Sequence, residues 1–240
     1  MDALGVPCVA AQAPYREGMA RTRSRVTIVL FDVDGTLIDS NDAHARSWVA
    51  TLADYPGVTF SRVRPLIGKG GDKVLPELTG LSSDSVVGRA LLARREALFR
   101  EELPRLAAFP GARALLARLR MRDQRPVVVS SARGDELQGL LAQARLSDLF
   151  EDTGAAEEAE HSKPDPDIVA VALQRAGAAP AEAVLIGDTP YDIAAARSAG
   201  VRAIALRCGG HWRDEDLAGA VALYNDPEDL LQRLSGSVLD

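Results

Sequence analysis

Apolar residues in this chain gather in short runs that alternate with helical patterns. Each run is nearly free of polar side chains, which is typical of a strand buried on both faces of a parallel sheet. The runs that we interpret as strands are residues 26–31, 126–130, 183–186 and 201–206. The first of them starts the regular part of the chain, and acidic residues follow it directly.

Segments between the later runs carry apolar residues at the spacing of one helical face. Leu137, Leu140 and Leu141 show this i, i+3, i+4 repeat. We expect helices from 112, from 137, at 167–176, at 190–199 and from 227 to about 234, and a polar, acidic loop at 155–162. Strands and helices that alternate with short connections fold as a parallel sheet with right-handed crossovers. The sequence therefore predicts an α/β protein with a Rossmann-like doubly wound sheet.

Only helical patterns occur between the first and the second predicted strand. The expected helices cover residues 42–55 and 60–67, a segment from about 72, and 83–102. A helical block of this size inside a strand–helix alternation predicts an inserted, all-helical cap domain. The expected division is a disordered tail at 1–25, a core at 26–40 and 109–240, and the cap at 41–108, with hinges at 37–41 and 109–111.

Composition restricts the classes of function. The chain has 240 residues, 47% hydrophobic and 26% charged, so it can bury a full core. Its net charge of −6 argues against non-specific binding to nucleic acid, and no apolar run reaches the roughly 18 residues of a membrane helix. Cys8 and Cys208 form no disulfide framework, which favours a reducing cytoplasm. Met19 is an alternative start to Met1, because the segment before it shows no core-forming pattern.

Two carboxylates follow the first predicted strand. Asp32 and Asp34 are two residues apart, and Gly35 allows the backbone to turn sharply after them. Asp188 follows the third apolar run in the same way. In an open α/β sheet, ligands bind at the carboxyl ends of the strands. The pattern thus predicts an acidic site at one edge of the sheet.

Four motifs resemble those of the haloacid dehalogenase superfamily, in that family's order. They are Asp32-Val-Asp34-Gly-Thr36, Val127-Val-Val-Ser130-Ser131, Ser162-Lys163-Pro-Asp-Pro and Val184-Leu-Ile-Gly187-Asp188-Thr-Pro-Tyr-Asp192. The resemblance extends over about residues 26–234 and implies a phosphatase with an aspartate nucleophile. Members that displace halide from carbon lack the acid at the position of Asp34, so its presence favours phosphate esters.

The resemblance also implies a role for each motif residue. Asp32 is expected to attack phosphorus as a carboxylate nucleophile. Asp34 is expected to protonate the departing alkoxide and then to activate the attacking water. Ser130 is expected to donate a hydrogen bond to a phosphoryl oxygen, and Lys163 to balance the clustered acids and the phosphate.

Mg²⁺ is the implied cofactor. Its expected ligands are the carboxylates of Asp32 and Asp188 and the main-chain carbonyl of Asp34. A few carboxylates that are completed by waters and phosphate oxygens suit Mg²⁺ better than a caged Ca²⁺. Asp192 lies one helical turn after Asp188 and is expected outside the ligand set, although direct ligation stays open.

Three further residues are predicted to contact the substrate: His44, Lys69 and Ser131. Residues 39–48 resemble the hinge and first cap helix of the phosphoglycolate phosphatase and β-phosphoglucomutase branch, which implies that His44 is near the site. Lys69 stands in a glycine-rich loop, at the place of the family's cap specificity loop, and is one of only three lysines in the chain. Lys73 is expected only to pair with Glu77 at i+4.

The leading prediction is a Mg²⁺-dependent phosphomonoesterase, similar to phosphoglycolate phosphatase, that acts on a small phosphorylated metabolite as a monomer or homodimer. A sugar phosphomutase of the same branch is the alternative, although its Arg/Ser-bearing cap loop differs from residues 68–73. A phosphonate hydrolase would need Lys69 as a reactive amine. A non-catalytic binding protein would be expected to lack one of the motif acids. Neither a nucleic acid nor a membrane is an expected partner.

Overall fold

The computed structural model describes residues 25–132, 134–151 and 153–240. The tail predicted at residues 1–25, apart from Arg25, lies outside the described residues, as do Met19 and Cys8. Within the described part of the chain, no helix has both the length and the apolar character needed to cross a membrane.

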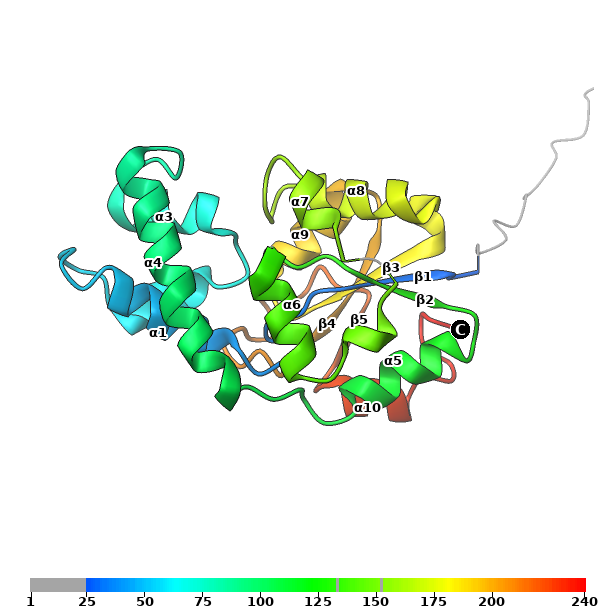
Figure 1. The fold of residues 1–240 in the computed structure, drawn as a ribbon. Helices are drawn as coiled ribbons and strands as arrows, with labels where there is room; N and C mark the ends of the chain where they lie inside the picture. The colour runs from blue at the N-terminus through cyan, green and yellow to red at the C-terminus, as the bar shows by residue number, and fades with distance from the viewer. Residues whose placement is uncertain (1–24, 133, 152) are drawn as a thin grey trace, which may run out of the picture.

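Among the described residues, a five-stranded sheet forms the centre of the fold (Figure 1). The strands are β1 Ile28–Phe31, β2 Arg125–Val128, β3 Ala183–Gly187, β4 Arg202–Leu206 and β5 Ala222–Tyr224. Their order across the sheet is β2-β1-β3-β4-β5, and all neighbouring pairs are parallel. The predicted doubly wound parallel sheet is therefore confirmed, with β1 between β2 and β3.

Helices cover both faces of this sheet. The helices are α1 Asn41–Thr51, α2 Phe60–Val63, α3 Gly71–Thr79, α4 Val86–Glu102, α5 Ala112–Arg120, α6 Gly134–Gln143, α7 Ala155–Glu158, α8 Asp167–Ala176, α9 Pro190–Ser198 and α10 Pro227–Gln232. One hydrophobic cluster joins the sheet to α5, α6 and α10, and a second joins it to α7, α8 and α9. These two helical layers lie on opposite sides of the strands (Figure 1).

Strand β1 shows how the apolar run produces this arrangement. Side chains of a strand point alternately to the two faces of a sheet. Val29 and Phe31 accordingly join the cluster under α5, α6 and α10, whereas Ile28 and Leu30 join the cluster under α7, α8 and α9. Every residue of β1 is buried, which is why the sequence shows no polar position in this strand.

The strand order contains one topological switch point, between β1 and β3. The chain leaves β1 for β2 on one side and returns across β1 to β3 on the other side. A crevice forms outside the carboxyl ends of two strands at such a point, because their connections leave in opposite directions. Asp32 follows β1 and Asp188 follows β3, so both acids stand at this crevice.

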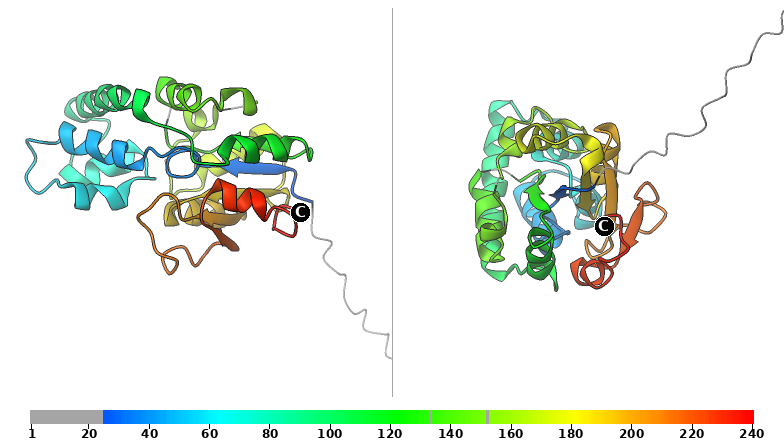
Figure 2. Two further views of the ribbon diagram at one scale, coloured as in Figure 1. Left: turned by 90° about the horizontal axis from the view of Figure 1, so that it is seen from below. Right: turned by 90° about the vertical axis from the view of Figure 1, so that its right-hand side faces the viewer.

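The helices α1–α4 form a block at the carboxyl ends of the strands (Figure 2). The block has its own hydrophobic cluster, in which Trp48, Leu52 and Leu75 are buried. Two adjacent segments connect it to the sheet: Ile38 pairs with Ala108 in an antiparallel bridge. The predicted hinge segments thus lie side by side, next to the carboxyl end of β1.

Several sequence predictions are wrong in detail. Residues 155–158 form the short helix α7 instead of a loop, because Ala155 and Ala156 pack into the cluster between α8 and the sheet. Strand β5 was not predicted, since it has only three residues, of which only Tyr224 is buried. The long helix of the block begins at Val86, after the predicted residue 83. The first block helix ends at Thr51, before the predicted residue 55.

Candidate active site

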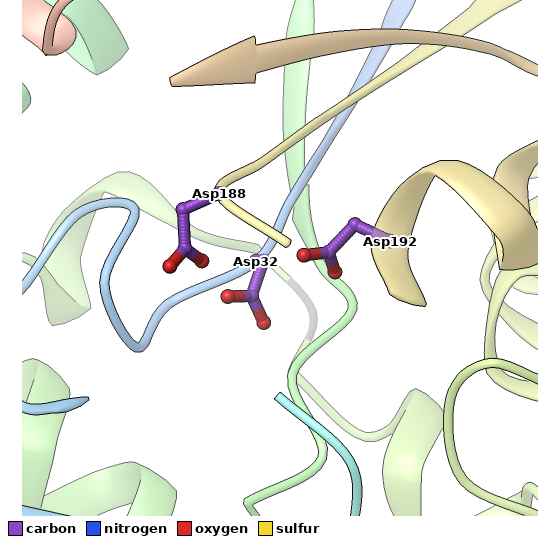
Figure 3. A group of neighbouring side chains, drawn as sticks. All are labelled: Asp32, Asp188 and Asp192. Atoms are coloured by element: carbon purple, nitrogen blue, oxygen red, sulfur yellow. The ribbon is translucent and has the colours of Figure 1, made fainter. Parts of the chain in front are cut away.

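Three carboxylates converge at the switch point (Figure 3). Asp32 comes from the end of β1, Asp188 from the end of β3, and Asp192 from the first turn of α9. One carboxylate oxygen of each lies within 4.8 Å of those of the other two, and all three residues are buried. Crowding of three buried acids is unfavourable unless cations compensate them.

Lys163 supplies one of these cations. Its Nζ donates to Asp32 Oδ1 at 2.5 Å and to Asp192 Oδ1 at 2.7 Å, and the side chain is fully buried. Burial lowers the pKa of Lys163, but the carboxylates of Asp192 and Asp32 raise it more, so the ammonium stays charged. Burial and the neighbouring acids Asp192, Asp188 and Asp34 raise the pKa of Asp32 despite the attraction of Lys163.

Asp188 lies on the other side of Asp32. Thr36 Oγ1 donates to its Oδ1 at 3.2 Å, and Asn41 Nδ2 donates to its Oδ2 at 2.9 Å. Burial first, and repulsion by Asp192 second, raise the pKa of Asp188 to about 7. A pKa so far above 3.8 means that the described protein groups do not fully compensate its negative charge.

The carboxylate oxygens at this site fit a hard divalent cation. Asp32 and Asp188 offer carboxylate oxygens at one edge of the sheet, and such oxygens are the ligands that Mg²⁺ prefers. Asn41 Oδ1 is a buried acceptor without a hydrogen-bond partner among the described residues. The two side-chain ligands predicted for Mg²⁺, Asp32 and Asp188, therefore lie close together. Asp192 lies close enough to join it, although one of its oxygens already accepts from Lys163.

Asp34 belongs to a hydrogen-bond network separate from that of Lys163. Its Oδ1 accepts from Ser40 Oγ at 2.5 Å and from His44 Nε2 at 2.7 Å. Burial raises the pKa of Asp34, but the His44 ring, the Ser40 hydroxyl and the Arg95 guanidinium lower it more, to about 2. Asp34 is therefore ionised at neutral pH. The structure places His44 in contact with Asp34.

Arg95 continues this network from α4 and was not found from the sequence. Its Nη2 donates to His44 Nδ1, and its Nη1 donates to both carboxylate oxygens of Glu136 on α6, at 3.0 and 2.7 Å. A guanidinium has no acceptor, so His44 Nδ1 accepts, and the proton of a neutral His44 lies on Nε2, toward Asp34. Arg95 also lies 5.1 Å from the ring centroid of Phe99.

The two serines after β2 make different contacts. Ser130 is buried, and its Oγ lies 3.4 Å from Asp34 Oδ2 while accepting from the amide of Ala132 at 3.0 Å. Ser131 lines the cavity, and its hydroxyl donates to the carbonyl of Gly68 at 3.3 Å. Ser130 therefore lies beside Asp34, and Ser131 contacts the block.

A cavity of about 850 Å³ separates the sheet edge from the helical block. Its lining includes Asp32 and Asp34 from the core and Lys69 and Lys73 from the block. Such a volume suits a small metabolite. The cavity thus connects the acidic site with cationic groups of the block.

The predicted partner of Lys73 is wrong. Lys73 Nζ pairs with Asp165 of the Lys163 loop at 2.5 Å, and Glu77 pairs instead with Lys69, at 2.6 Å. Lys69 also lies over the ring of Tyr191, 5.0 Å from its centroid. The loop before α3 therefore contacts the core on one side and places Lys69 at the cavity wall.

The arrangement contains side chains of the kinds that phosphoryl transfer requires. Such a reaction needs an aligned nucleophile, compensation of the phosphoryl oxygens and a proton for the leaving group. Asp32 is a carboxylate between the cation Lys163 and a candidate metal position, and Asp34 is a separate carboxylate two residues later. The different environments of the two acids favour different roles.

Comparison with known proteins places the chain among hydrolases. The family model described as haloacid dehalogenase-like hydrolase matches residues 29–206. The chain is 30% identical over 193 residues to the "Probable phosphatase IndB" of Dickeya dadantii, covering 78% of this chain and 84% of that protein. It is 29% identical over 208 residues to a phosphoglycolate phosphatase of Rhodospirillum rubrum, covering 82% and 86%. Among solved structures, a hydrolase from Pseudomonas syringae superimposes with a TM-score of 0.80 at 27% identity, covering 88% of this chain and 98% of that one.

Proposed function

The chain belongs to the haloacid dehalogenase-like hydrolase family, and from that premise we propose that it is a Mg²⁺-dependent phosphomonoesterase of small phosphorylated metabolites. The observation that carries this proposal is the position of Asp32. Its carboxylate receives the Lys163 ammonium at 2.5 Å and lies with Asp188 at the switch point of the sheet. Asp34 follows two residues later, in a separate hydrogen-bond network.

In the proposed first half-reaction, Asp32 attacks phosphorus and forms an aspartyl-phosphate. A bound Mg²⁺, held by Asp32, Asp188 and the main-chain carbonyl of Asp34, supplies positive charge that offsets the charge of the phosphoryl oxygens. Lys163 compensates Asp32 before attack and the phosphoryl group after it. Ser130 is one hydrogen-bond donor for the same oxygens, since its hydroxyl lies beside the acids.

Asp34 exchanges a proton twice in this mechanism. It is ionised before substrate arrives, because its pKa is about 2. The negative charges of a phosphate raise the pKa of a neighbouring carboxyl, so substrate binding favours protonation of Asp34, and this proton passes to the leaving oxygen. In the second half-reaction, the ionised Asp34 takes a proton from the water that hydrolyses the aspartyl-phosphate. His44 and Ser40 keep the carboxylate oriented toward the site.

The helical block, residues 41–108, acts as a mobile lid in this proposal. Its two connections to the core lie side by side, which is the arrangement that a hinge requires. Lys69 is the proposed contact to the part of the substrate that differs between metabolites, with His44 and Ser131 nearer to the phosphate. The relative named phosphoglycolate phosphatase supports a substrate with a short anionic tail. We also propose that the enzyme is cytoplasmic and that it is a monomer or a homodimer.

The test is phosphate release from a generic aryl phosphate by the full chain, with and without Mg²⁺, followed by a panel of phosphorylated metabolites. Asp32→Asn keeps the shape of the side chain but removes the nucleophile. We expect this variant to melt at or above the wild-type temperature and to lose essentially all turnover. Near-normal activity of Asp32→Asn would contradict the proposed mechanism. Transfer of the phosphoryl group to a sugar instead of water would assign the chain to the phosphomutases.

A further inference from the structure

Asn41 is a buried amide at the boundary between the helical block and the acidic site. It is the first residue of α1 and is 2% exposed. Its Nδ2 donates to Asp188 Oδ2 at 2.9 Å and lies 3.4 Å from the carbonyl of Gly209. The amide must turn its Nδ2 toward Asp188, because Oδ1 in the same place would be repelled by the carboxylate oxygen. Asn41 thus connects the block directly with Asp188.

Two glycines from distant parts of the chain make this contact possible. A Cβ on Gly35 would lie 1.9 Å from Asn41 Nδ2 and 2.4 Å from Asp188 Oδ2. A Cβ on Gly209 would lie 1.8 Å from the same Asp188 oxygen. Gly35 also has a φ of +77°, which other residues rarely adopt. The amide and the carboxylate therefore meet in a slot that any side chain at either glycine would close.

A second residue of the block contacts Gly209. Arg64, in the 3-10 helix Arg64–Leu66, donates from its Nη2 to the carbonyl of Gly209. Its Nε donates at 2.6 Å to Asp42, the residue after Asn41. Asn41 and Arg64 therefore hold the Gly209 carbonyl from two elements of the block, directly beside Asp188.

We propose that Asn41 is a positioning residue of the metal site, which fixes the Asp188 carboxylate and couples metal binding to the start of the helical block. This inference rests on the Mg²⁺ site of the proposed function. A carboxylate that is held in one orientation by a hydrogen bond binds a cation better than one that is free to rotate. Because Asn41 begins α1, the orientation that favours the cation also favours the observed position of this helix.

The first measurement is the Mg²⁺ affinity of the full chain by isothermal titration calorimetry. We expect Asn41→Ala to bind Mg²⁺ about tenfold or more weakly than the wild type, the scale for loss of a residue that orients a metal ligand. The matched control is Asn225→Ala, which changes the chain's other asparagine, an exposed residue outside the site. The control should bind Mg²⁺ as the wild type does.

The second measurement is amide hydrogen exchange with and without Mg²⁺. In the wild type and in Asn225→Ala, Mg²⁺ should slow exchange in a peptide that covers residues 37–48. In Asn41→Ala, Mg²⁺ at saturation should slow this exchange clearly less, because the connection to α1 is lost. A residue that served only to begin the helix would change exchange equally with and without the metal.

The outcomes separate this inference from the proposed function. If the wild type binds no Mg²⁺, the proposed function fails, and this inference fails with it. If the wild type binds Mg²⁺ and folded Asn41→Ala binds it equally well, only the role of Asn41 is overturned. Should Asn41→Ala not fold, Asn41→Ser, with a small polar side chain that is too short to hold Asp188, takes its place and must show the same weakening.

Discussion

The sheet edge and the helical block hold their charged residues in different ways. At the sheet edge, Lys163 is fully buried and bonds to two buried acids that come from β1 and α9. In the block, Lys69 and Lys73 pair with Glu77 and Asp165, whose side chains are 47% and 45% exposed. Buried pairs are costly to break, whereas exposed pairs contribute little. The ion pairs at the sheet edge therefore stay in place, whereas a substrate can displace the acids that pair with lysines of the block.

Two ion pairs between the two regions do not involve the residues of the acidic cluster. Lys73–Asp165 and Arg95–Glu136 both join the block to the core, yet neither includes Asp32, Asp188 or Lys163. Opening of the block would break these pairs and leave the bonds of Lys163 intact. The exceptions are the contacts of His44 with Asp34 and of Asn41 with Asp188, through which the block reaches the acids. We infer that the sheet edge sets the reaction and that the block sets the substrate.

The largest expected effect comes from Lys163→Met, which keeps the length of the side chain but removes the charge. Two buried carboxylates then lose their cation, and breaking a buried pair in this way costs about 3–5 kcal/mol. We expect a loss of this size in the free energy of unfolding at pH 8 without Mg²⁺, measured with urea, and loss of turnover on every substrate. A loss of activity that depended on the substrate would break the division between the two regions.

The stability of Lys163→Met should also depend on pH with a known sign. The folded-state pKa of Asp32 already lies above 3.8, and removal of the nearby cation raises it further. The folded protein then holds a proton that the unfolded chain releases, so stability is retained at low pH and is lost as pH rises above 3.8 toward the folded-state value. The deficit of the variant relative to the wild type should be smaller at pH 5 than at pH 8. An equal deficit at both values would mean that the lost energy is packing alone.

A smaller and selective effect is expected at Lys69. Lys69→Ala should lower kcat/KM for the best substrate with an anionic tail by roughly 10–100-fold, the scale of one charge-assisted contact. Hydrolysis of an aryl phosphate with an uncharged tail should fall far less. Arg62→Ala is the control, because it removes a positive charge from an exposed residue of the block that does not line the cavity. Equal losses on both substrates, or none on either, would show that Lys69 is not the specificity residue.

The same comparison explains what could be predicted from the sequence. Acids at the ends of buried strands could be found, because a near-continuous apolar run marks β1 and β3 and their carboxyl ends meet at one edge. The parallel sheet follows from the alternation of these runs with helical patterns. These features depend on local patterns and on general rules of sheet topology. The structure confirms the parallel sheet and places the acids at one edge of it.

The features that could not be predicted depend on tertiary contacts. Arg95 follows another arginine on α4, and nothing in the pattern tells which of the two reaches His44 and Glu136. The pairing of Lys73 with Glu77 was inferred from helical spacing, but Lys73 faces the core loop that carries Asp165. An ion pair between two elements leaves no periodic signal in either. The contacts that these residues of the block make with the core could therefore be learned only from the structure.

The most direct test of the central claim is to trap the phosphoryl group on Asp32. In Asp34→Asn, an aryl phosphate should still react, because an aryl alcohol leaves without a proton from the enzyme, whereas the water of the second half-reaction is no longer activated. Rapid mixing with excess aryl phosphate and Mg²⁺ should release a burst of about one aryl alcohol per chain, followed by slow turnover. Acid quench and peptide mapping should then place the phosphoryl group on Asp32. A burst with the phosphoryl group on another residue, or turnover at the wild-type rate without a burst, would contradict the account.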